Sequence, residues 1–160
     1  MLIRPFRPAD RATVIDLWHR CGITRPWNDP DRDIDRKLAV RDDLFLVGEG
    51  GGGHGGGHSG RDGDERDGEH RDGLIATMMV GYDGHRGWVN YLAVHPDCRG
   101  QGLGRMLMCE AERRLTALGC PKLNLQVRSD NEAVLAFYRA LGYEIDAAVS
   151  LGKRLIADDR

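Results

Sequence analysis

The sequence predicts an α/β fold with a mixed sheet, built as a single domain. Three observations lead to this prediction. The chain has 160 residues, the size of one compact domain that buries roughly 70% of the surface its unfolded chain exposes. Segments with a helical spacing of apolar residues alternate along it with short apolar runs typical of strands. No internal repeat divides the sequence.

The N-terminal part begins with a strand and two helices. Residues 1–7 carry apolar side chains interrupted by Pro5, which favours an edge strand. Residues 8–21 have helical spacing, and a glycine follows as a stop. Asp29 before Pro30 suits the N-cap of a short second helix that extends to about residue 42. Residues 44–47 are then a short apolar strand.

Residues 50–73 differ sharply in composition from the rest of the chain. They contain eleven glycines and three histidines but no Leu, Ile, Val, Phe, Tyr or Trp. Such a segment cannot repay its ordering entropy by burial, so we expect a disordered loop insert between two strands. The alternative is weak capture of a transition metal by His54, His58 and His70.

The C-terminal half supplies the remaining elements. Two strands are expected at 74–82 and 88–94, followed by a glycine-rich turn and a helix that ends near residue 118. Residues 122–127 alternate between apolar and polar side chains and predict a further strand. A helix then begins at a capping box, Ser129–Glu132, and ends before Gly142, and residues 143–156 are expected to form one or two strands joined near Gly152.

Composition excludes several classes of partner. With 23 Lys and Arg against 25 Asp and Glu, the formal charge of -2 provides no cationic field for a nucleic acid. No stretch approaches the about 18 apolar residues of a membrane span, and the N-terminus lacks an apolar signal core, so a cytoplasmic protein is expected. The four cysteines form no C-x-x-C pair, and neither a disulfide nor a metal site is expected from them.

The most informative stretch runs from Tyr91 to Arg105, where a strand passes through a glycine-rich turn into a helix. This arrangement directs free backbone N–H groups and the positive end of a helix at one point, which suits phosphate oxygens. A dinucleotide fingerprint would need glycine at Arg105, and no G-K-[ST] follows for a P-loop.

This turn resembles the pyrophosphate-binding motif of the GNAT (N-acetyltransferase) superfamily, [RQ]-x-x-G-x-[GA], through Arg99, Gly102 and Gly104. Residues 91–96 are similar to the fourth strand of that family, and residues 130–143 to its N-x-x-A…[FY]-Y-x-x-x-G-[FY] signature. Segments 25–30 and 81–88 further resemble the bacterial YpeA-type subgroup. The resemblance implies a mixed, mostly antiparallel central sheet flanked by about four helices.

The resemblance also implies acetyl-CoA as co-substrate, an amine as acceptor and transfer by direct attack in a ternary complex. Main chain near Leu92, Ala93 and Val94 would pair with the pantetheine arm. The side chain of Asn131 would contact the cofactor as well. The diphosphate would be bound by the backbone amides of Arg99, Gly100, Gln101, Gly102, Leu103 and Gly104. The side chain of Arg99 or Arg105 would add a charge-assisted hydrogen bond.

Two catalytic roles follow from the same resemblance. Tyr138 would be the general acid for the departing thiolate, against the alternative that it only packs in its helix stripe. A general base is harder to name, because the fourth-strand glutamate that several members of the family carry has no counterpart between Trp88 and Tyr91. Asp83, His85 and Glu49 are the candidates, each acting directly or through water.

The acceptor itself cannot be named from the sequence. The loop that lines the acceptor cleft in this family contains Trp27, Asn28 and Asp29. The alternative for Asp29 is that it caps the following helix and does not contact the acceptor. A rival hypothesis is an acyl-CoA-binding sensor without catalysis, favoured by the missing carboxylate. A third is metal delivery through residues 50–73. Dimers are common among proteins that resemble this one, so a homodimer is an open expectation.

Overall fold

The computed structural model describes residues 1–51 and 73–158. Five strands and four α-helices, with two short 3-10 turns, are formed in this part of the chain. In order they are β1 (Leu2–Pro5), η1 (Pro8–Asp10), α1 (Arg11–Arg20), α2 (Pro30–Val40), β2 (Phe45–Glu49), β3 (Leu74–Tyr82), β4 (Gly87–Val94), η2 (Pro96–Cys98), α3 (Leu103–Ala117), β5 (Leu123–Leu125) and α4 (Glu132–Arg139).

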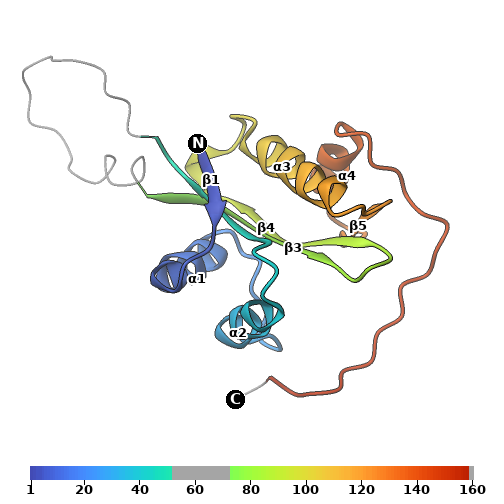
Figure 1. Cartoon of the computed structure of the whole chain (residues 1–160), viewed down its shortest axis with the longest axis horizontal. Coiled ribbons are helices and arrows are strands. Elements are labelled where there is room, and N and C mark those ends of the chain that lie inside the picture. Colours follow the sequence, from blue (N-terminus) through green and yellow to red (C-terminus); the bar gives the residue numbers. More distant parts are fainter. Residues whose placement is uncertain (52–72, 159–160) are drawn as a thin grey trace, which may run out of the picture.

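The strands form one sheet in the order β1-β2-β3-β4-β5. The first three pairings are antiparallel, and β5 lies parallel to β4. Figure 1 shows α1 and α2 on one face of this sheet and α3 and α4 on the other. Each face has its own apolar cluster, one around Trp18 and Ile34 and the other around Met78 and Leu107. Helices on both faces explain why β3 is apolar along most of its length.

The predicted fold class is confirmed, and most elements lie within a few residues of their expected bounds. β1 is an edge strand, as Pro5 indicates. Asp29 caps α2 by accepting hydrogen bonds from the backbone amides of Asp31 and Arg32. Most of the predicted loop insert, residues 52–72, lies outside the described residues.

Two local predictions are wrong. The N-cap of α4 is Asn131, whose Oδ1 accepts the Val134 amide at 3.2 Å, and not Ser129. The Asn131 amide is already bonded to the Arg128 carbonyl in a turn, so the helix starts two residues later than the capping box predicts. Residues 143–156 form no strand within the described part of the chain, because no neighbouring strand supplies main-chain partners there.

Replacing Asp29 with alanine should destabilise the protein by about 1 kcal/mol, since the N-terminal amides of α2 lose their cap. Asp29 is buried, which makes replacement of its hydrogen bonds by water incomplete. Urea unfolding at pH 7 measures the change. Asp31→Ala is the matched control, because Asp31 is an exposed acidic residue in the first turn of the same helix. Equal losses in both variants would contradict the capping role.

Glu110 should contribute stability that depends on pH. Hydrogen bonds from Arg113, together with Arg114, lower the pKa of Glu110 from 4.5 to about 2. The contribution is therefore complete above about pH 4.5 and is lost as the pH falls towards 2. Glu110→Gln should be less stable than wild type in urea at pH 7, and the difference should shrink at pH 3. A difference that stays constant with pH would contradict this assignment.

Candidate active site at the parting of two strands

The candidate site begins where β4 and β5 separate. The two strands pair only through Gly87–Leu123, Trp88–Asn124 and Val89–Leu125. β4 continues to Val94, whereas β5 ends at Leu125. From Asn90 onward, the edge of β4 that faced β5 therefore has no strand partner among the described residues. Unpaired backbone groups of this kind are available to an extended ligand.

A bulge at Tyr91 bends β4 at the same point. Met79 pairs with Asn90 and Thr77 with Ala93, so β4 has one more residue than β3 in this interval. Tyr91 takes a φ of 52°, an uncommon value for a residue with a side chain. Its ring stacks on Trp18 at 4.2 Å between centroids. The bulge directs Tyr91 and Ala93 towards α1 and α2, and Leu92 and Val94 towards α3 and α4.

The glycine-rich turn lies at the end of β4 and leads into α3. Gly100 and Gly102 have φ values of 75° and 76°, which only glycine adopts without strain. Among the described residues, no main-chain acceptor is bonded to the amides of residues 100–105. The first helical bond of α3 is from Met106 to the Gly102 carbonyl at 3.1 Å. Six neighbouring amides at the start of a 15-residue helix are thus available to an anion.

The amide of Arg99 does not share this property. It donates to the Pro96 carbonyl at 3.2 Å and closes the η2 turn, which corrects the expectation that it is one of the free donors. The Arg99 side chain is exposed and donates from Nε to the Val94 carbonyl at 3.3 Å. Arg105 is also exposed, with Nη2 at 3.4 Å from the Ala140 carbonyl.

Gly104 has a different structural role from Gly102. A Cβ at Gly104 would lie 3.1 Å from Cζ of Phe137, so a side chain here would push α4 away from α3. A Cβ at Gly102 would have no protein atom within 4 Å. Gly104 therefore permits close packing of α3 against α4, and Gly102 leaves open space beside the free amides.

Tyr138 lies on α4 and contributes to the core cluster between the sheet and α3. Its ring meets Phe137 and Tyr143 edge to face, with centroids 5.0 and 5.7 Å away. Burial raises the pKa of Tyr138 to about 12, so the phenol keeps its proton at neutral pH. The side chain thus packs as the structural alternative predicts, and it also retains a proton that can be donated.

The loop between α1 and α2 lies on the other face of the sheet. The guanidinium of Arg154 donates to the Trp27 carbonyl at 2.9 Å and to Oδ1 of Asn28 at 3.3 Å. The ring of Trp27 is half exposed, while Asp29 is buried as the cap of α2. Asn131, predicted to touch the cofactor, uses its side-chain oxygen to cap α4 and has an exposed side chain.

The three candidate bases lie in different places. Asp83 accepts the amides of Arg86 and His85 at 2.7 Å each, and these bonds lower its pKa. Asp83 and His85 belong to the turn before Gly87, at the opposite end of β4 from Val94. Glu49 is at the end of β2, which pairs with β3, and its Oε1 accepts a hydrogen bond from Nε of Arg4 at 2.7 Å. The structure does not bring these three side chains together.

Sequence reasoning missed the polar contacts that surround Tyr91. The Tyr91 hydroxyl donates to Oδ2 of Asp33 at 2.6 Å, and its pKa is raised well above the usual value by burial and by Asp33. Asp33 also accepts a hydrogen bond from the guanidinium of Arg36 at 3.0 Å, and the same guanidinium donates to the buried Asp158. The sequence indicates only that Asp33 lies one turn after Asp29, the N-cap of α2.

The described residues contain neither a metal-binding cluster nor a membrane-spanning helix. In residues 1–51 and 73–158, no group of three or more His, Cys, Asp or Glu side chains is arranged to hold a metal ion. No helix in the same part of the chain is long and apolar enough to cross a membrane.

Comparison with known proteins gives one consistent result. A model described as the acetyltransferase (GNAT) family matches residues 12–143. An acetyltransferase from Sodalis glossinidius is 47% identical over 159 residues, covering 99% of this chain and 98% of its own length. One from Pectobacterium atrosepticum is 46% identical over 158 residues, with the same coverage of both chains.

Solved structures with low sequence identity share the fold. Ard1 from Thermoplasma volcanium superposes with a TM-score of 0.70 at 19% identity, over 91% of this chain and 84% of that protein. Glucosamine-6-phosphate N-acetyltransferase from Arabidopsis thaliana gives a TM-score of 0.61 at 18% identity, over 97% and 98% of the two chains.

Proposed function

The chain belongs to the acetyltransferase (GNAT) family, and from this premise we propose that it transfers an acetyl group from acetyl-CoA to a primary amine. The acceptor is a small molecule, a protein N-terminus or a lysine. The observation that carries the proposal is the adjacency of two sets of backbone groups that have no main-chain partner among the described residues. One is the edge of β4 after Val89, and the other is the run of amides at residues 100–105.

These groups fit the two ends of an acyl-CoA. The amides of residues 100–105 and the start of α3 are suited to the diphosphate, with Arg99 or Arg105 adding a charge-assisted hydrogen bond. The pantetheine arm carries amide groups that can pair with an unpaired strand edge, here at Leu92, Ala93 and Val94. An acetyl thioester extended along this edge would reach the bulge at Tyr91, where a backbone N–H can polarise its carbonyl.

Tyr138 is the proposed general acid. Its proton stays on the phenol at neutral pH, and the departing thiolate is the group that needs one. Asn131 is a further cofactor contact through the amide nitrogen that capping leaves unused.

The amine would approach from the α1 and α2 side of the sheet, where Trp27, Asn28 and Asp29 precede α2. The free amine is the nucleophile, so a lysine-type acceptor needs a base more than an α-amine does. Asp83, His85 and Glu49 stay predictions for that role, reached directly or through water. Location in the cytosol and assignment to the YpeA-type subgroup also stay predictions.

One observation favours a second candidate, a non-catalytic acyl-CoA sensor. β4 has no carboxylate in its whole sequence, GWVNYLAV. The same assay separates the two functions. Purified protein is incubated with acetyl-CoA and a panel of amino acids, amino sugars, polyamines and peptides, while thiol release is recorded. Turnover with at least one amine is expected, and tight binding of acetyl-CoA without turnover on any acceptor would favour the sensor.

A further inference from the structure

The last part of the chain carries one buried carboxylate at the end of an exposed stretch. We call residues 144–158 the C-terminal segment. Every residue from 144 to 157 is exposed, yet the side chain of Asp158 is only 3% exposed. Among the described residues, no main-chain hydrogen bond joins this segment to another main-chain group. Backbone pairing therefore does not hold Asp158 in its place.

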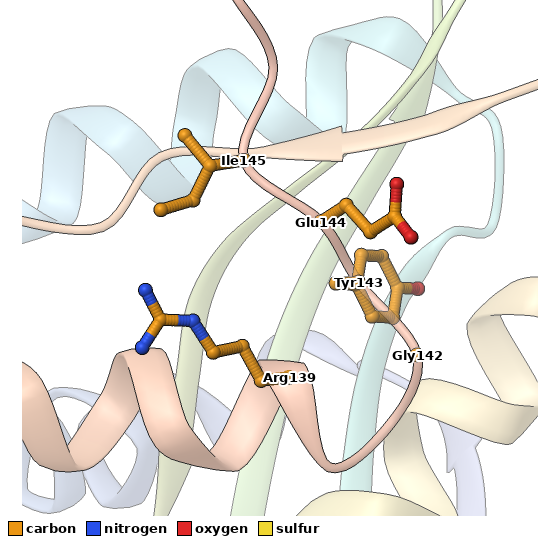
Figure 2. A pocket seen from close by; sticks show the side chains of 5 residues that line it. All are labelled: Arg139, Gly142, Tyr143, Glu144 and Ile145. Atoms are coloured by element: carbon orange, nitrogen blue, oxygen red, sulfur yellow. The ribbon is translucent and has the colours of Figure 1, made fainter.

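The segment leaves α4 beside a hollow that its own side chains do not fill. The hollow has a volume of about 420 Å³ and is lined by Arg139, Gly142, Tyr143, Glu144 and Ile145. Figure 2 shows the side chains of Arg139 and Ile145 extending to the same side of the chain. Ile145 stays 72% exposed beside this hollow. Apolar burial therefore does not fix the start of the segment.

Polar side-chain contacts guide the C-terminal segment around the molecule. Asp146 accepts hydrogen bonds from Nζ of Lys122 at 2.6 Å. Further along, the guanidinium of Arg154 donates to the Trp27 carbonyl at 2.9 Å and to Oδ1 of Asn28 at 3.3 Å. Figure 1 shows the segment leaving α4 and ending beside α2. Its last described residues therefore lie against the loop that we propose for acceptor binding.

Two arginines of α2 bind Asp158. Arg36 donates from Nη1 to Oδ2 at 2.7 Å and from Nη2 to Oδ1 at 2.6 Å, a bidentate geometry that suits a carboxylate. Arg32 lies one turn earlier on the same face of the helix, with Nη1 at 3.5 Å from Oδ1. The hydrogen bonds from Arg36 lower the pKa of Asp158 to about 2, so this group is an anion at neutral pH. Both arginine side chains are half exposed, which leaves them accessible to a carboxylate from solution.

The guanidinium of Arg36 also connects Asp158 to the bulge of β4. Its Nη1 donates to Oδ1 of Asp33 at 3.0 Å, and Oδ2 of Asp33 accepts the Tyr91 hydroxyl at 2.6 Å. Tyr91 is the bulge residue, one position before Leu92, where we place the acetyl thioester. Asp158 is thus the last member of a continuous row of polar contacts that begins at the proposed site of transfer.

We propose that Arg36, supported by Arg32, is a binding site for a carboxylate of the acceptor, and that Asp158 occupies this site when no acceptor is bound. The inference rests on the proposed acetyl transfer and narrows its acceptor to amines that carry a carboxylate. An arginine recognises a carboxylate through two parallel hydrogen bonds, whereas a primary amide offers it only one acceptor oxygen. Asp158 competes with the acceptor at the effective concentration that its attachment to the chain sets.

Matched acceptors test the specificity of this site. Glycine, γ-aminobutyrate and ε-aminocaproate differ in the distance between amine and carboxylate, and each is compared with its primary amide at equal concentrations of free amine. The best carboxylate acceptor should have a kcat/KM about 30-fold above that of its amide. In Arg36→Gln this value should fall to about that of the amide, and Arg36→Lys should keep part of the preference, because an ammonium lacks the planar fork. Equal kcat/KM for both forms in the wild type would overturn the inference and leave acetyl transfer intact.

Removing the competing carboxylate tests the role of Asp158. Asp158→Asn should lower the KM for the best carboxylate acceptor by about tenfold and leave kcat unchanged, because the segment is already displaced in the ternary complex. Asp146→Asn is the matched control, since Asp146 belongs to the same segment but binds Lys122, and its KM should equal that of the wild type. A KM for Asp158→Asn at or above the wild-type value would overturn the inference and show that Asp158 only anchors the segment.

Backbone resonances of the segment test the site without turnover. In ¹⁵N-labelled protein with coenzyme A bound, the carboxylates of the panel should move the amide resonances of Ala157 and Asp158 towards random-coil positions, and their amides should not. Displacement of Asp158 without turnover of any acceptor would support the carboxylate site and contradict acetyl transfer. Turnover with these resonances unchanged at saturating acceptor would overturn the carboxylate site and leave acetyl transfer standing.

Discussion

Gly102→Ala should weaken acetyl-CoA binding by about 30-fold, as measured by calorimetry. The φ of 76° costs a residue with a Cβ roughly 1–2 kcal/mol, so the turn is expected to relax and to redirect its amides. Losing one charge-assisted hydrogen bond to the diphosphate costs about 1.5–3 kcal/mol, which corresponds to roughly 10- to 150-fold in affinity. The space beside Gly102 is open, so no clash within the protein confuses the result.

Gly119 offers a matched control at the other end of α3. Its φ is 77°, and a Cβ built there also meets no atom within 4 Å. Gly119→Ala should therefore lose a similar amount of stability in urea while binding acetyl-CoA normally. If both variants bound acetyl-CoA like the wild type, the assignment of the diphosphate to this turn would be wrong.

Tyr138→Phe should lower kcat by about 100-fold and leave the affinity for acetyl-CoA nearly unchanged. General acid catalysis contributes roughly 10²- to 10⁴-fold, and water can replace part of this contribution. The ring stays in place in the variant, so its edge-to-face contacts with Phe137 and Tyr143 are kept. Steady-state kinetics with the best acceptor from the amine panel measures the change.

Tyr143→Phe is the control for losing a phenol in this region. The Tyr143 hydroxyl donates to Glu112 at 2.7 Å, on the surface of α3. Its removal should leave kcat unchanged. A Tyr138→Phe enzyme with normal turnover would show that the proton comes from elsewhere, whereas equal losses in both variants would indicate a packing effect.

Much of the fold could be predicted because its signals are local. A buried strand such as β3 is apparent from its apolar run, and the cap of α2 from Asp29 and Pro30. The turn that includes Gly102 was predicted as a phosphate site from its place between a strand and a helix and from the resemblance of its motif, and among the described residues the amides of residues 100–105 have no main-chain acceptors. Each of these features depends on residues close together in the sequence.

The remaining features depend on contacts between distant residues. Asp158 and Arg36 are 122 residues apart, and no local pattern predicts that they meet. The positive φ of Tyr91 follows from a mismatch between β3 and β4, which neither strand reveals by itself. Residues 143–156 were predicted to form one or two strands, but a strand also needs a partner, and among the described residues no main-chain hydrogen bond joins residues 144–156 to another segment.

The backbone amides of residues 100–105 can be observed individually by NMR spectroscopy. In ¹⁵N-labelled protein, coenzyme A should shift the amide resonances of Gly100 to Arg105, whereas S-acetyl-pantetheine, which lacks the diphosphate, should shift only those near Leu92 and Val94. Unchanged resonances at residues 100–105 in the presence of saturating coenzyme A would show that these amides do not bind the diphosphate.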